Sequence, residues 1–178
     1  LILGEIKNYL NGNDSNLFSY DSSYTINKVF SFNFDFIFSQ AVFEHIEKPR
    51  KAIQNIYNLL EDGGLCFARF NLYYGPSASH LMSSLNIPWA HLLYSDDAIR
   101  TMMKEKTGRD VGLAWVNKLS HLHYLDYFEK ENLIVKKKWF RTFNMDPNFY
   151  KLHFDKLKSY PKEDLSLDFM HVLLEKKR

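Results

Sequence analysis

The sequence predicts an α/β protein with a mainly parallel sheet. Short apolar runs of the strand type alternate with segments of helical periodicity, which is typical of strands joined by helical crossovers. Hydrophobic residues make up 46% of the 178 residues and aromatic residues 16%, enough to fill a sizeable core. A chain of this length fits one core, so we expect a single domain over residues 1–178.

The first half of the chain is expected to hold two helices and three strands. The run from Phe34 to Ser39 is aromatic and β-branched, which is typical of a buried parallel strand. Pro49 suits the first turn of a helix, and Gly63-Gly64 is expected to end it. The other expected elements are a helix at residues 1–10 and strands at residues 17–20 and 65–70.

In the second half, residues 73–94 have no clean period and are expected to form a long loop. Ser95 can cap a helix that Gly108 ends. The remaining elements are helices from Ser120 and from Asp146 to about residue 160, with strands at 133–140 and 169–174. The apolar residues of the Ser120 helix that are expected to face the core are Leu122, Leu125 and Phe128.

Charge and cysteine content indicate which partners and compartments fit the sequence. The net charge is +2 with acidic and basic residues interleaved, so no nucleic-acid partner is indicated, and the lysines at 136–138 and 176–177 fit solvated charges. Cys66 is the one cysteine, which favours a reducing compartment and hence a cytoplasmic location. No apolar run approaches the roughly 20 residues of a membrane span. The oligomeric state stays open.

The stretch from Phe34 to Ile46, with Pro49 and then Leu59-Leu60-Glu61-Asp62-Gly63-Gly64-Leu65, resembles class I S-adenosylmethionine-dependent methyltransferases of the methyltransferase type 11-like kind. In that family pattern, a strand that begins with Phe-Asp ends at Ser before a Glu-His helix start. The next helix ends at Leu-Lys-Pro-Gly-Gly, where Asp62 replaces the usual proline. The resemblance implies a Rossmann-like, mainly parallel sheet with an antiparallel C-terminal edge pair.

The resemblance also implies S-adenosyl-L-methionine as the cofactor. Ser39, Gln40 and Val42 would line its ribose and methionine side, and Asp21 and Ser22 would contact the adenine. The general rule that ligands of open parallel sheets lie beyond the carboxyl ends of the strands also points to Ser39 and Gln40. Asp21 fits an ordinary turn residue equally well.

Candidate residues for catalysis and substrate binding follow the two best strands. His45 is a candidate catalytic base beside Glu44, although a histidine at a helix start often bonds the backbone instead. The 73–94 segment is expected to cover a small-molecule or saccharide substrate with four side chains, Tyr74, His80, Trp89 and His91. The alternative is that Trp89 packs this segment onto the core. His121 and His123 cannot share a helix face, which argues against a metal pair on that helix. With one cysteine and scattered histidines, the sequence predicts no metal site.

The sequence contains no Gly-x-Gly, whereas family members hold the cofactor with a glycine-rich loop. The resemblance therefore implies that this loop, an acidic residue and the first βαβ portion lie upstream of Leu1. We expect the 178-residue chain by itself to bind the cofactor weakly or not at all and to be inactive. The expected function is methyl transfer to a small molecule or saccharide, and the alternative is a non-catalytic interaction domain.

Overall fold

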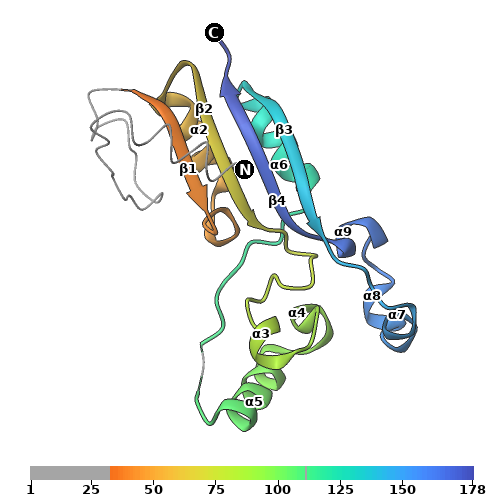
Figure 1. Ribbon diagram of the computed structural model, residues 1–178. Helices are drawn as coiled ribbons and strands as arrows, with labels where there is room; N and C mark the ends of the chain where they lie inside the picture. The colour runs from red at the N-terminus through yellow and green to blue at the C-terminus, as the bar shows by residue number, and fades with distance from the viewer. Residues whose placement is uncertain (1–32, 111) are drawn as a thin grey trace.

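The computed structural model describes residues 33–110 and 112–178. The helix expected at residues 1–10, the strand expected at 17–20, and Asp21 and Ser22 lie outside the described residues. The described strands form one sheet in the order β1-β2-β4-β3 (Figure 1). Their bounds are Phe34–Gln40 for β1, Leu60–Asn71 for β2, Leu133–Thr142 for β3 and Leu167–Lys176 for β4.

The sheet combines one parallel pair with two antiparallel pairs. β1 and β2 run parallel, with Ser39 opposite Ala68 and Gln40 opposite Arg69. β4 runs antiparallel to both β2 and β3. The α/β class, the parallel neighbours β1 and β2, and the antiparallel pair at the C-terminal edge are therefore confirmed. The parallel part of the described sheet is the β1–β2 pair.

The junction between the first helix and β2 differs from the prediction. Helix α2 (Pro49–Leu59) gives way directly to β2 at Leu60, so Gly63 and Gly64 lie inside the strand. The ladder is irregular there, since Phe34 pairs with Leu60 but Phe36 pairs with Leu65. Gly63 has a φ of 81°, which glycine adopts without the steric penalty of a side chain. The glycine pair thus forms an irregular start to β2 and not a helix end.

Most of the other helices have six residues or fewer. Their bounds are Phe43–His45 for the 3-10 helix η2, Met82–Leu85 for α3, Ala90–Leu93 for α4, Asp96–Thr107 for α5, His121–Lys130 for α6, Pro147–Leu152 for α7, Phe154–Leu157 for α8 and Lys162–Ser166 for α9. The start of α5 is as predicted, because Ser95 Oγ accepts a hydrogen bond from the Ala98 N–H at 3.3 Å. Its predicted end is also confirmed, with Gly108 at a φ of 69°. The expected 73–94 loop instead contains α3 and α4, and the helix expected from Asp146 to about residue 160 is divided at His153.

Helices α2 and α6 pack together against the sheet and enclose the main core (Figure 1). Tyr124 and Phe128 are fully buried in this core, and Leu125 packs partly against it. Leu122 is 62% exposed, so its predicted core position is wrong. The reason is helix geometry: residues four apart share one face, and the buried face is the one that carries Tyr124 and Phe128.

β1 is less buried than its apolar sequence predicts. β1 is an edge strand of the described sheet, and Phe38 is 47% exposed. Successive side chains of a strand point to opposite faces, so Ile37 packs against the core while Phe38 stacks on Phe67 with ring centroids 5.8 Å apart. Phe67 in turn stacks on Trp139 at 5.8 Å. A row of aromatic rings therefore crosses the sheet on the face opposite the main core.

Candidate functional site

The polypeptide turns sharply at the carboxyl end of β1. Ala41 has a φ of 52°, and its N–H donates to the Arg69 carbonyl at 2.8 Å, which keeps the turn against β2. Ser39 is half-buried, whereas Gln40 and Val42 are exposed. The carboxyl ends of the two parallel strands thus lie side by side, and three of the five residues predicted to contact the cofactor lie at this edge.

A buried asparagine fixes the η2 turn that follows. Asn117 Nδ2 donates to the carbonyls of Phe43 at 2.7 Å and Ile46 at 3.1 Å, and the Asn117 N–H donates to the Glu44 carbonyl at 2.7 Å. Tyr124 OH donates to Asn117 Oδ1 at 3.0 Å, and burial raises the pKa of Tyr124. The segment before α6 therefore holds Glu44 and His45 in place.

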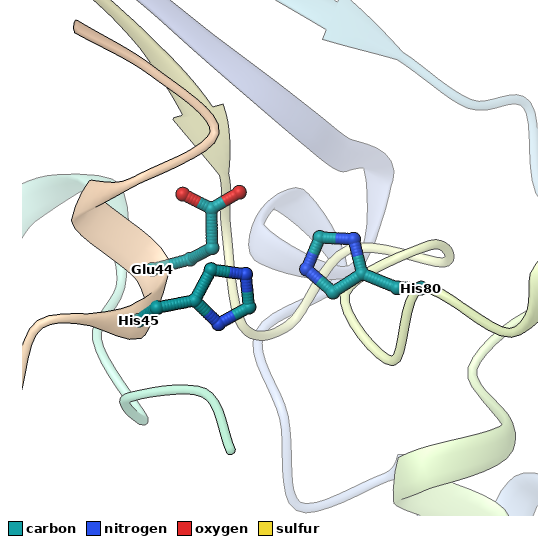
Figure 2. A group of neighbouring side chains, drawn as sticks. All are labelled: Glu44, His45 and His80. Carbon is teal, nitrogen blue, oxygen red and sulfur yellow. The ribbon is translucent and has the colours of Figure 1, made fainter. Parts of the chain in front are cut away.

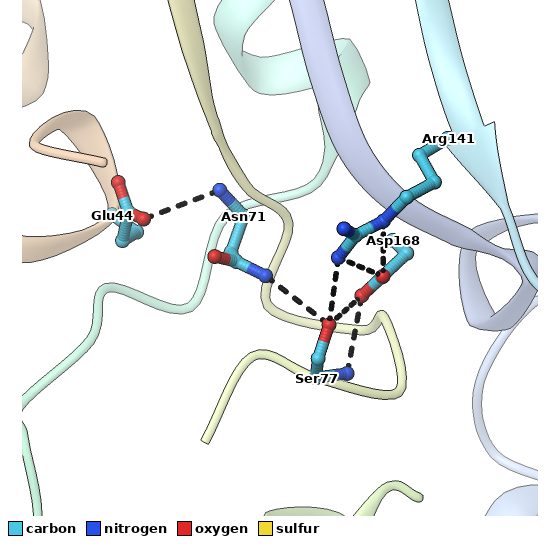
Figure 3. Close-up of polar contacts among 5 residues, drawn as sticks. All are labelled: Glu44, Asn71, Ser77, Arg141 and Asp168. Atoms are coloured by element: carbon cyan, nitrogen blue, oxygen red, sulfur yellow. Dashed lines mark hydrogen bonds and ion pairs between the residues drawn. The ribbon is translucent and has the colours of Figure 1, made fainter. Parts of the chain in front are cut away.

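Glu44 has a buried carboxylate, and one of its two oxygens has no hydrogen-bond partner in the described residues. Its side chain is 2% exposed, and Oε1 accepts from the Asn71 N–H at 3.3 Å (Figure 3). Oε2 is buried and has no hydrogen-bond partner in the described part of the chain. Burying a carboxylate oxygen without a partner costs free energy, so this atom is a candidate to bind a ligand.

The structure brings His45 and His80 together beside Glu44, although they lie far apart in the sequence. Their ring centroids are 4.9 Å apart, and Figure 2 shows one nitrogen of each ring directed toward the other ring. The Trp115 carbonyl lies 2.8 Å from His45 Nδ1 and can only accept, so Nδ1 carries a proton, and in the neutral tautomer the lone pair is on Nε2. His80 has a φ of 58°, and burial together with the nearby His45 lowers its pKa, against the opposing effect of Glu44.

The sequence predicted no metal site, and the structure brings together three side chains that could bind an ion. One ligand atom each from Glu44, His45 and His80 lies within 4.8 Å of the other two. The prediction rested on His121 and His123, which are close in sequence, and on the scattered positions of the other histidines. His121 in fact pairs with Asp164, with Nδ1 3.0 Å from Oδ1, and does not belong to this group.

A second polar network joins the loop after β2 to the C-terminal edge of the sheet (Figure 3). Asp168 Oδ1 accepts from both the N–H and the hydroxyl of Ser77, and the N–H distance is 3.1 Å. Asp168 Oδ2 accepts from Arg141 Nε at 2.8 Å and Nη2 at 2.5 Å. Ser77 Oγ also accepts from Asn71 Nδ2 at 3.4 Å, which links this network to the residue that binds Glu44. Sequence reasoning did not predict this network.

Gly75 allows the loop to approach β4 this closely. A Cβ at this position would lie 2.5 Å from the Leu167 carbonyl oxygen and 2.8 Å from Asp168 Cα. Both neighbours are backbone atoms, which cannot move aside as a side chain does. The glycine thus places Ser77 within reach of the Asp168 carboxylate.

Tyr74 and His91, two of the predicted substrate residues, make contacts within the protein. The Tyr74 ring is half-buried against Tyr160 at 5.5 Å, and burial raises the pKa of Tyr74. His91 Nε2 donates to the Tyr73 carbonyl at 2.6 Å, while Nδ1 is buried without a partner in the described residues. Burial lowers the pKa of His91 to about 4, against the opposing effect of the Tyr73 bond. His91 is therefore a neutral residue that fastens the loop.

The low pKa of His91 predicts a loss of stability in mild acid. Its ordinary value of about 6.5 applies in the unfolded chain, so the unfolded state takes up a proton first as the pH falls toward 4. The contribution is present above pH 6.5 and is lost on the way to pH 4, by up to about 3 kcal/mol. We expect urea unfolding of wild type and His91→Gln between pH 7.5 and 5 to show a shallower fall in the variant. Equal slopes would contradict this account of His91.

Trp89 is not available to a substrate in this structure. Its side chain is 1% exposed, and the indole Nε1–H donates to the Leu165 carbonyl at 3.1 Å. The ring packs against Phe143 at 5.4 Å and Phe149 at 5.6 Å, in a second core that also holds Leu157. This geometry corrects the expectation of an aromatic wall and favours the alternative, in which Trp89 packs the 73–94 segment onto the rest of the chain.

Comparison with known proteins connects this arrangement to a family. The family model described as a methyltransferase domain matches residues 27–68, which include β1, η2 and α2. A Listeria monocytogenes structure assigned to the S-adenosylmethionine-dependent methyltransferases is similar with a TM-score of 0.52 at 8% identity, over 97% of this chain and 76% of that one. Residues 27–68 thus match the methyltransferase domain family, and the described sheet has a fold similar to that of class I methyltransferases.

Two further structures resemble this methyltransferase-like domain. An S-adenosylmethionine-dependent methyltransferase from Mesorhizobium loti is 10% identical over 97% of this chain and 75% of that one, with a TM-score of 0.49. A protein from Bacillus halodurans assigned to the methyltransferases is 15% identical over 99% of this chain and 79% of that one, with a TM-score of 0.44. No curated protein sequence matches the chain. In the described ranges, no helix combines the length and apolar character needed to cross a membrane.

Proposed function

We propose that this domain belongs to an S-adenosylmethionine-dependent methyltransferase that acts on a small-molecule or saccharide acceptor. The parallel β1–β2 pair carries the proposal, because its carboxyl ends meet at one edge and deliver Gln40 and Asn71 there. Ligands of open α/β sheets gather at such an edge. The match of residues 27–68 to the methyltransferase domain family supports the same reaction class.

The residues at this edge fit the cofactor that the family implies. Gln40 and Val42 are exposed, so an amide and an apolar side chain are both available for ribose hydroxyls and for the methionine portion. Ser39 adds a half-buried hydroxyl directly before them. The bound cofactor supplies a methyl group activated on a sulfonium. The chain would bind and orient it, and positioning of this kind accounts for much of such catalysis.

His45 is the proposed general base. It would take a proton from a substrate that loses one when it is methylated. Its Nδ1–H is held by the Trp115 carbonyl, which leaves the Nε2 lone pair exposed. A neutral imidazole in a fixed tautomer is suited to general base catalysis. His80, which faces His45, is the substrate-segment residue that reaches this edge. Tyr74, His91 and Trp89 would act as supports of the loop.

A cofactor titration of the protein as its gene encodes it tests the proposal. Gln40→Ala is expected to weaken S-adenosylmethionine binding about tenfold, the effect of one hydrogen bond worth about 1–1.5 kcal/mol. Gln54→Ala is the matched control, because Gln54 lies on α2 and bonds Lys51 Nζ there. The 178-residue chain by itself is expected to bind weakly.

The alternative function is a non-catalytic interaction domain that keeps the fold. The absence of measurable S-adenosylmethionine binding by the protein as its gene encodes it would favour this alternative. If Gln40→Ala and Gln54→Ala bind the cofactor equally well, the assignment of Gln40 is incorrect even where wild type binds it.

A further inference from the structure

We propose that Glu44, His45 and His80 form a binding site for a divalent transition metal ion of the zinc type. The three residues come from two segments, η2 after β1 and the loop after β2, that meet at the edge of the sheet. Two imidazoles and one carboxylate are a ligand set that Zn²⁺ takes in proteins, and three protein ligands leave a fourth position open.

The strongest support comes from Glu44. A buried carboxylate oxygen without a hydrogen-bond donor is rare, and Oε2 is such an atom in the described part of the chain. A metal ion would supply the missing positive partner. Oε1 is already held by the Asn71 N–H, so the carboxylate is oriented as the ligands of metal sites usually are, by a bond from outside the site.

His45 is likewise oriented by a hydrogen bond to a residue outside the proposed site. Its Nδ1–H donates to the Trp115 carbonyl at 2.8 Å, which fixes the ring and leaves Nε2 as the ligand atom. Metal-binding histidines almost always donate their second N–H in this way. Figure 2 shows a nitrogen of the His45 ring directed toward the His80 ring, with the Glu44 carboxylate beside them.

The spacing of the ligand atoms permits an ion after a small adjustment. They lie within 4.8 Å of one another, whereas ligands at about 2.1 Å in a tetrahedral zinc site are roughly 3.4 Å apart. His80 is exposed, so its ring can move toward Glu44 and His45 without disturbing the core. Glu44, which is buried and held, would be the fixed point of the site.

This inference deepens the proposed function and depends on it for its chemical consequence only. With an ion bound, His45 Nε2 would be a ligand and could not accept a proton, so the ion would take over the role proposed above for His45. An oxygen of the methyl acceptor would occupy the open position, where the ion would lower the pKa of a bound hydroxyl. The proton would pass to water, and the oxygen would take the methyl group from the sulfonium, which would leave as a neutral thioether. The substrate class would then be a hydroxyl-bearing molecule that methylates on oxygen.

Co²⁺ titration of the full chain, without S-adenosylmethionine, tests the metal site separately from methyl transfer. We expect one equivalent of Co²⁺ to give the visible absorption of a four-coordinate ion, and Zn²⁺ to displace it. His80→Ala is expected to weaken Co²⁺ binding at least about 100-fold, because even outer-shell changes cost about 10–100-fold. His153→Ala is the control, since His153 packs against Phe149 far from the cluster in sequence and is expected to leave binding unchanged.

A second variant separates a metal ligand from a structural residue. Glu44→Gln keeps the shape and can still accept from the Asn71 N–H, so the metal-free variant is expected to be at least as stable as wild type, while Co²⁺ binding falls. Zn²⁺ should raise the Tm of wild type and leave that of His80→Ala unchanged. Absence of the visible bands in wild type, or equal Co²⁺ affinity in wild type and His80→Ala, would overturn the proposal. Neither result would bear on cofactor binding measured with Gln40→Ala.

Discussion

Replacing Trp89 with alanine is expected to lower the free energy of unfolding by about 3–5 kcal/mol, the range for deletion of a buried tryptophan. The side chain is enclosed by Phe143 and Phe149, and its indole N–H bonds the Leu165 carbonyl. Truncation would leave a cavity and an unpaired carbonyl at once. Urea unfolding followed by circular dichroism measures this loss.

Trp115→Ala is the matched control, because that side chain is 55% exposed. Its backbone carbonyl, which binds His45, is kept in the variant. A change below about 1 kcal/mol is expected there. If Trp89→Ala proves as mild as Trp115→Ala while lowering substrate use, Trp89 belongs to a substrate site after all, and the packing role assigned here is incorrect.

Replacing Asp168 with alanine is expected to lower the free energy of unfolding by about 3 kcal/mol. Removing one partner of a buried ion pair costs about 3–5 kcal/mol. Because the Arg141 side chain is half exposed, we expect a loss at the lower limit of this range. The Asp168 side chain is 7% exposed and that of Arg141 is 53% exposed. The variant also leaves the Ser77 N–H without its acceptor.

Asp62→Ala provides the comparison for Asp168→Ala. Asp62 lies 3.6 Å from Lys176 Nζ and is largely exposed, so losing this pair should cost less than about 1 kcal/mol. Limited proteolysis would add a local readout, since Asp168 fastens the loop after β2 and cleavage near Ser77 should become faster. Similar losses in the two aspartate variants would show that the network contributes little.

Local sequence signals predicted the elements whose causes are local. The apolar run from Phe34 gives β1, and Ser95 and Gly108 bound α5, because a strand period and a helix cap depend on neighbouring residues. The parallel pairing of β1 and β2 was reached through the order of strand, helix and strand. The antiparallel pair at the C-terminal edge came from the family resemblance and not from any local pattern.

The errors fall where distant residues decide the outcome. Leu122 is a good core residue by composition, but the buried face of α6 is set by contact with α2 and the sheet. Gly63 looks like a helix stop, whereas it occupies an irregular start of β2 opposite Phe34. The sequence pattern around Trp89 predicts a loop, but the side chain is buried in a core. The residues that enclose it come mainly from positions 143–165, far along the chain.

The candidate site shows the same limit. Ser39, Gln40 and His45 were found because they follow a recognisable strand. Asn117, which holds the η2 turn, and Asp168, which fastens the loop, have no local pattern that marks them. His80 was assigned to the substrate segment, and its position against His45 depends on how the loop after β2 folds back.

Alkylation of Cys66 can be used to measure how often the sheet opens. The thiol is fully buried in β2, between Ile37 of β1 and Leu174 of β4, and burial raises its pKa to about 12. A thiol in this state does not react with alkylating reagents, because the thiolate is the reactive form. It is the one cysteine in the chain, so any labelling comes from molecules whose central strands have separated. The rate of labelling therefore measures how often β2 parts from its two neighbours under native conditions, with no probe added to the protein.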